Sequence, residues 1–102
     1  MSRRALYMIC VKPIVTLTQI IKELAPEIPY TLLKKYYRYY RRRDIVRVYC
    51  MIHSIAVYLK NTRPNTSIEL LRICITVFAN LGKIDCSANS FFELFQIYYQ
   101  HG

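Results

Sequence analysis

The sequence predicts an all-α fold, and three observations lead to this prediction. Apolar residues recur at the i, i+3/i+4 and i+7 spacing of helix faces along most of the chain. Two segments carry the helix-start pattern S/T-x-x-E/Q. The chain also contains an internal repeat at helical spacing. With 102 residues, of which 54% are apolar, the chain is long enough for one modest core and too apolar to be disordered. We therefore expect a single domain, residues 1–102.

The repeat is clearest in two short segments. Residues 31–41 read TLLKKYYRYYR, and they align without gaps with residues 90–100, which read SFFELFQIYYQ. The shared apolar positions fall at i, i+1, i+4, i+7 and i+8, which is one face of a helix. Thr31 and Ser90 occupy the positions where an N-cap hydroxyl is expected.

An earlier pair of segments matches in the same order. Lys12-Pro13 corresponds to Arg63-Pro64, and the two capping-box patterns, Thr16–Gln19 and Thr66–Glu69, correspond to each other. Chance similarity between short amphipathic helices is the competing explanation. The matched order favours two diverged copies of one helical unit, packed with pseudo-twofold symmetry in one domain: residues 12–43 and residues 63–101.

The expected helices lie near residues 17–25, 32–42, 44–60, 67–80 and 91–100. Pro26 ends the first helix, and Gly82 ends the fourth as a left-handed C-cap. Residues 83–89 are expected to form a loop. The chain should bend near 42–44, because a continuous helix would carry its apolar face across Arg43 and Arg47. Residues 5–11 fit either a short helix or a strand.

The aromatic residues divide into packing and exposed candidates. Tyr36, Tyr39 and Tyr40 match aromatic residues of the second copy that have no cations around them, so a packing role is favoured over base stacking. The matching residues, Phe95, Tyr98 and Tyr99, are expected to pack in the same way. Tyr37 lies off this face and is the best candidate for an exposed aromatic side chain.

Charge is concentrated in one segment. The chain has 15 basic and 6 acidic residues, a net charge of +9, and residues 34–47 contribute +6 of it. Several of these cations oppose uncharged or acidic residues in the second copy, so the fold itself does not require them. A solvated face, phosphate contacts and an acidic protein partner all remain open. The candidate partner-binding residues are Lys34, Lys35, Tyr37, Arg38, Arg41, Arg42 and Arg43.

No catalytic or metal site is predicted, and no cofactor. His53 lies among apolar residues, the acids are scattered, and His101 is at the terminus. The cysteines, which form no C-x-x-C pair, are expected to be buried free thiols rather than disulfides: Cys10, Cys50, Cys74 and Cys86.

No membrane span or secretion signal is predicted. The longest apolar run, Val48 to Leu59, is too short to cross a bilayer. The signal-like start is broken by Lys12-Pro13 and has no small-residue cleavage site. We therefore expect an intracellular protein.

The chain resembles a known class of small proteins in its texture. Stretches such as MSRRALYMICVKPIV and YYRYYRRR, in a basic, Gly-poor chain rich in Ile and Tyr, are similar to the small orphan proteins of viruses that infect thermoacidophilic archaea, in particular Acidianus-type filamentous viruses. The resemblance covers composition and length and transfers no functional residue. It implies a non-enzymatic accessory role in the host cytoplasm, with viral or host partners.

The leading functional hypothesis is a non-enzymatic protein-interaction module. A seam between two helical repeats, if it does not close into a core, would form a groove for a peptide or partner protein. The alternative is sequence-independent nucleic-acid binding through the basic face at 34–47. An anionic membrane is a third partner, but it would require the apolar face that the core needs.

Overall fold

The computed structural model describes residues 2–101, and within this range it contains helices and no strand. The prediction of an all-α single globule is therefore confirmed. The helices are α1 (Arg3–Leu6), α2 (Lys12–Leu24), α3 (Tyr30–Arg41), α4 (Ile45–Leu59), α5 (Pro64–Asn80) and α6 (Ile84–His101). A π-helical turn at Tyr7–Val11 joins α1 to α2, and a 3-10 turn at Ala25–Glu27 follows α2.

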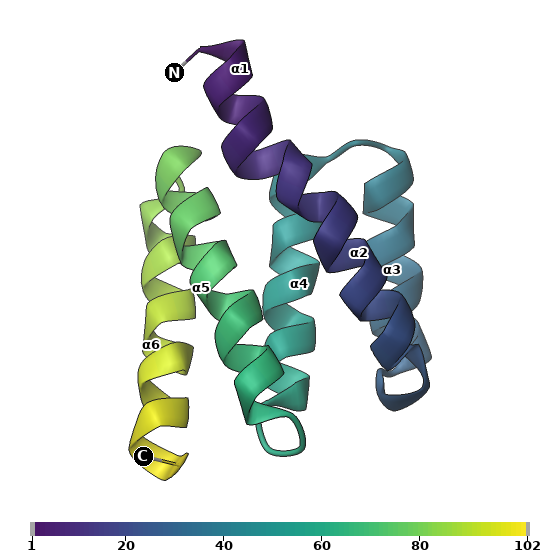
Figure 1. The fold of residues 1–102 in the computed structure, drawn as a ribbon, viewed down its shortest axis with the longest axis vertical. Helices are drawn as coiled ribbons and strands as arrows, with labels where there is room; N and C mark the ends of the chain where they lie inside the picture. The colour runs from purple at the N-terminus through teal and green to yellow at the C-terminus, as the bar shows by residue number, and fades with distance from the viewer. Residues whose placement is uncertain (1, 102) are drawn as a thin grey trace.

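Helices α2 to α6 run alternately down and up (Figure 1). Helix α4 packs against α3 on one side and against α5 on the other, and α6 packs mainly against α5. Helices α3 and α6 therefore lie at opposite sides of the bundle, while α2 crosses the face formed by α3 and α4 (Figure 1). The short connections explain why neighbours in sequence are antiparallel neighbours in space.

The core is centred on α4. This helix buries seven of its fifteen residues, more than any other helix among residues 2–101. Side chains from the other helices complete the core, including Leu17 and Ile21 of α2, Tyr36 of α3, and Leu71 and Phe78 of α5. The buried residues of α4 are Val48, Tyr49, Met51, Ile52, Ile55, Ala56 and Leu59.

The N-terminal segment is helical from Arg3 to Leu24, so the expected break at Lys12-Pro13 is wrong. Proline has no N–H, and its ring crowds the carbonyl four residues earlier. The π-helical turn lies immediately before it, with the Lys12 N–H donating to the Tyr7 carbonyl. This wider turn accommodates the ring, so the helix continues through Pro13.

Continuity gives this segment an additional property. The helical stretch Arg3–Glu27 is long and apolar enough, by length and composition, to cross a bilayer. The expectation of no membrane span rested on the longest apolar run, Val48 to Leu59, which lies in α4. In this structure one face of the stretch, including Cys10, Ile14 and Leu17, is buried in the core.

The predicted helix starts are wrong at several places. Thr16 and Ser90 lie inside helices α2 and α6, and Thr31 lies inside α3. Thr66 also lies inside a helix, because Pro64 starts α5 at the position that suits a proline best. The loop expected at 83–89 is the first part of α6, where the Ser87 hydroxyl donates to the Ile75 carbonyl of α5 at 2.9 Å.

Two predicted chain reversals are confirmed. Helix α3 ends at Arg41 and α4 begins at Ile45, with the Asp44 carboxylate accepting the Arg47 N–H at the start of α4. Arg43 adopts a positive φ of 56° to make this turn. Gly82 follows α5 with a φ of 74°, which is the left-handed conformation expected there.

Buried tyrosine hydroxyls fasten the N-terminal segment to the core. Tyr36 of α3, predicted as a packing residue, is fully buried and shares a 2.6 Å hydrogen bond with Thr18 of α2. Burial raises the pKa of Tyr36 to about 12. The Tyr49 hydroxyl of α4 donates to the Cys10 carbonyl at 2.6 Å. Each polar tip is thereby satisfied inside an apolar core.

The Tyr49→Phe variant tests the second of these bonds. It leaves the buried Cys10 carbonyl without the hydroxyl donor, so we expect the free energy of unfolding to fall by about 1–2 kcal/mol. Urea denaturation followed by circular dichroism measures this change. Tyr58→Phe is the matched control, because Tyr58 lies on the same helix with 54% of its surface exposed. Equal stabilities of the two variants would contradict the role given to the Tyr49 hydroxyl.

Candidate nucleic-acid interface and apolar groove

The outer face of α3 carries most of the predicted site. Tyr36 is the one fully buried residue of this helix, and the side opposite to it faces solvent. The helix contains no acidic residue between Tyr30 and Arg41. Its exposed cations therefore lie on the solvated face, opposite the face that packs Tyr36 with the half-buried Leu32 and Tyr39. These cations, continued into the following turn, are Lys34, Lys35, Arg38, Arg41, Arg42 and Arg43.

Among the described residues, 2–101, no carboxylate is paired with these cations. Within residues 2–101, the ion pairs join Arg47 to Asp44, Lys60 to Glu93 and Arg63 to Glu27, and none involves α3. The strongest of them holds Arg63 between both Glu27 oxygens at 3.0 and 2.9 Å. This pairing raises the pKa of Arg63. The positive charge of α3 therefore remains available to an external anion.

Aromatic side chains accompany the cations. Tyr30, at the start of α3, is 75% exposed, and Tyr37 is half-buried with its ring edge-on to Tyr36 at a centroid distance of 5.3 Å. Together with Leu33 they line a shallow hollow of about 650 Å³. The cations around this hollow are Lys34, Arg38, Arg41 and Arg42.

The structure separates the remaining basic residues from this hollow. Lys35 is exposed but is not part of its lining. Arg43, in the turn, lines a different hollow beside Val11 and Val15 of the N-terminal segment. Arg47 is bound to Asp44 at 3.1 Å and lies over the Tyr39 ring. Tyr30 was missed, although its position one turn before Lys34 on the same helix face could have indicated it.

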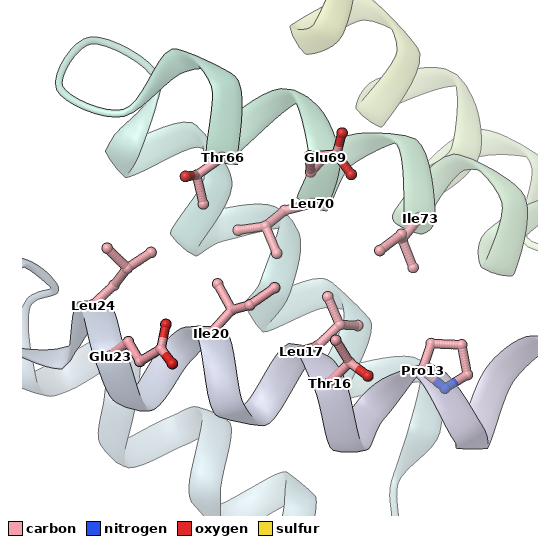
Figure 2. Close-up of a pocket in the computed structure, with 10 residues that line it drawn as sticks. All are labelled: Pro13, Thr16, Leu17, Ile20, Glu23, Leu24, Thr66, Glu69, Leu70 and Ile73. Carbon is pink, nitrogen blue, oxygen red and sulfur yellow. The ribbon is translucent and has the colours of Figure 1, made fainter.

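A second candidate site lies between α2 and α5. Figure 2 shows side chains from the two helices pointing toward a common hollow, whose volume is about 530 Å³. Its base includes Leu17 and Leu70, both fully buried. The residues that line it are Pro13, Thr16, Leu17, Ile20, Glu23, Leu24, Thr66, Glu69, Leu70 and Ile73.

The chemistry of this groove differs from that of α3. Its walls are aliphatic, and its two charged residues are the exposed carboxylates of Glu23 and Glu69, one from each helix. An aliphatic hollow between acidic side chains suits an apolar segment that carries cations at its edges. It does not suit a phosphate backbone.

The aromatic face of α6 is exposed, which contradicts the sequence prediction for Phe95, Tyr98 and Tyr99. Their exposed fractions are 58%, 43% and 83%. Helix α6 instead buries Ser90, Leu94 and Ile97. This orientation includes a polar contact that periodicity does not reveal: the Ser90 hydroxyl and the His53 Nδ1 of α4 lie 2.8 Å apart.

His53 lies beside Ser90 and lines a small surface hollow together with Cys50 and Cys86. Ser90 is completely buried, so its hydroxyl is not accessible to a substrate. Burial lowers the pKa of His53, and the nearby Glu93 carboxylate partly opposes this effect. Within residues 2–101 the four cysteines are free thiols, and no three His, Cys, Asp or Glu side chains are placed to hold a metal ion.

The lowered pKa of His53 predicts a pH-dependent stability. The unfolded chain takes up a proton near the ordinary value of 6.5, whereas the folded chain resists it, so stability is retained above 6.5 and falls as the pH drops below it. We expect His53→Gln to flatten this decrease. Urea denaturation at a series of pH values measures it, with His101→Gln, at an exposed position, as the control. An unchanged profile in His53→Gln would contradict this assignment.

Comparisons of the chain with protein-family models, with curated proteins and with solved structures find no match. The geometry of the two candidate sites is therefore the basis for a function.

Proposed function

We propose that the chain binds nucleic acid, without catalysis and independently of sequence, through the outer face of α3. The observation that carries the proposal is the set of exposed cations on this helix, beside two accessible tyrosines, with no carboxylate paired to them among residues 2–101. The net charge of +9 adds long-range attraction to any polyanion.

The arrangement suits the phosphate backbone of a single strand. Cations at Lys34, Arg38 and Arg41 follow one another at intervals of one turn along α3 and can contact successive phosphates. Tyr30 and Tyr37 offer ring faces beside them, and stacking of bases on aromatic rings tolerates any sequence. Contacts of both kinds carry affinity without base-edge readout.

Fluorescence anisotropy of labelled oligonucleotides tests this proposal. If four phosphates of a single strand are contacted, affinity should fall about 50-fold between about 50 and 200 mM salt. Changing Lys34, Lys35, Arg38 and Arg41 together to Gln should remove most of the affinity and reduce the salt slope by about 3. A duplex of the same length shows whether single strands are preferred.

The control variant removes the same charge elsewhere. Arg3, Arg4, Lys12 and Lys22 are exposed cations of the N-terminal segment, and their change to Gln also lowers the net charge from +9 to +5. It should retain most of the salt slope. If both variants lost the same affinity, the binding would depend on overall charge and not on α3. Absence of binding at low salt would overturn the proposal.

The groove between α2 and α5 supports a second candidate function, the binding of a peptide or partner protein. It lies between the helices that carry the matched segments Thr16–Gln19 and Thr66–Glu69. We infer that α2 with α3 and α5 with α6 are the two copies of the repeat, and that the groove is the seam between them. The aliphatic walls and the two glutamates then favour an apolar helix with basic edges.

A short amphipathic helical peptide of Leu, Ala and Lys is a suitable probe for the groove. Its binding should depend mainly on apolar contacts, and Ile20→Asp, which places a charge in the groove wall, should weaken it at least tenfold. Val15→Asp is the control, because Val15 is on the same helix, 71% exposed and outside the groove. Equal affinities of the two variants would place the peptide elsewhere.

A further inference from the structure

Helix α6 turns its more apolar face toward solvent. The face that packs on the bundle includes Ser90, Leu94 and Ile97, whereas the outer face is formed by large aromatic side chains. On α3, the corresponding positions of the repeat are less exposed: Tyr36 is buried and bonded to Thr18 of α2, whereas Tyr40 is 40% exposed. Among residues 2–101, nothing covers the outer face of α6. Its exposed large apolar residues are Ile84, Phe91, Phe92, Phe95, Tyr98 and Tyr99, here called the α6 aromatic stripe.

We propose that the α6 aromatic stripe is the interface of a homodimer, in which α6 packs antiparallel to α6 of a second copy. Four observations favour a second copy as the partner: the spacing of the stripe, its area, its charge and its place on the bundle. The proposal concerns a different face from α3 and does not depend on the nucleic-acid proposal.

The spacing of the stripe is that of a helix-pairing seam. Ile84, Ala88, Phe91, Phe95 and Tyr98 follow one another at alternating intervals of four and three residues, with Phe92 and Tyr99 on one flank. This is the heptad spacing by which two helices pack along their length. A twofold axis near Phe91 and Phe92 would pair each half of the stripe with the opposite half of its copy.

The area of the stripe suits a small stable dimer. Its five aromatic residues are between 43% and 83% exposed. At 150–250 Å² for each aromatic side chain, they leave on the order of 600 Å² accessible, a large patch for a monomer. Ile84, which is 65% exposed, and flanking atoms bring this toward the roughly 800 Å² per partner of a standard interface.

Electrostatic repulsion between two copies is weaker at α6 than at the basic faces of the bundle. Two copies that each carry +9 repel one another wherever their cations meet. Helix α6 contains no Lys or Arg, and its charged residues are Asp85 and Glu93, the second of which is directed to Lys60, immediately after α4. It is also at the side of the bundle opposite to the basic α3 (Figure 1). Pairing through α6 therefore keeps the two basic faces far apart.

The stripe is also partly ordered before association. The Tyr98 hydroxyl accepts a 2.6 Å hydrogen bond from Arg72 of α5, and the Phe95 and Tyr99 rings stack with centroids 6.5 Å apart. Side chains that are already held lose less conformational freedom when a partner covers them.

Sedimentation equilibrium of the purified chain, at micromolar concentrations and without nucleic acid, tests the dimer. The expected mass is twice the monomer mass of 12.2 kDa. Phe95→Glu places a charge in the centre of the stripe and should return the mass to that of the monomer. Val15→Glu, at an exposed apolar position of α2, should remain dimeric. Circular dichroism confirms that each variant is folded.

A cross-linking variant keeps the proposal testable if Phe95→Glu does not fold. Phe92→Cys lies near the expected twofold axis, so mild oxidation should yield a covalent dimer, whereas Val15→Cys should not. A wild-type chain that stays monomeric at high micromolar concentration would overturn the proposal, including the case in which the monomer instead sediments with lipid vesicles. Dissociation of both glutamate variants, or equal cross-linking of both cysteine variants, would also overturn it.

Discussion

Helix α4 must be covered on most of its circumference, and the positions of the other helices follow from this requirement. Seven of its fifteen residues are buried on one broad face, and only Arg47 and Tyr58 are exposed. Helices α3 and α5 cover its sides, and the N-terminal segment covers a third part, where Tyr49 bonds to the Cys10 carbonyl. A helix with so wide an apolar face is stable in water only when several neighbours cover it. The flanking helices then have outer faces free for other purposes.

The outer faces of α3 and α6 differ in composition. On α3 the cations face outward, and the aromatic residues are divided: Tyr36 is buried, whereas Tyr30 and Tyr40 are exposed. On α6 the outer face carries large aromatic residues in place of cations, while Ser90, Leu94 and Ile97 are buried. The buried Ser90 hydroxyl lies 2.8 Å from Nδ1 of the partly buried His53, so its polar group has a partner inside the bundle.

Sequence-based prediction succeeds for features set by nearby residues and fails for features set by contacts between distant residues. The central helix, the turn at Asp44, the left-handed Gly82 and the buried Tyr36 were predictable, because each depends on local periodicity or on a residue's own conformational preference. The exposed cations of α3 were predictable because the aligned segment 90–100 has the same apolar spacing without them. The orientation of α6 was not, since that helix has two faces able to pack and the contacts of its buried face, such as Ser87 with Ile75 and Ser90 with His53, join residues distant in sequence. Passage of the helix through Pro13 likewise required a π-helical turn that no local pattern signals.

The antiparallel succession of helices also has a kinetic consequence. Helices α3, α4, α5 and α6 each pack against the next one in the chain, so most of their contacts join residues close in sequence. Such topologies fold quickly, because little chain entropy is lost before contacts form. The N-terminal segment is different, since its π-helical turn contacts α5 and closes a long loop over α4. We therefore expect α3 to α6 to fold first and the N-terminal helix to dock afterwards, which completes the core.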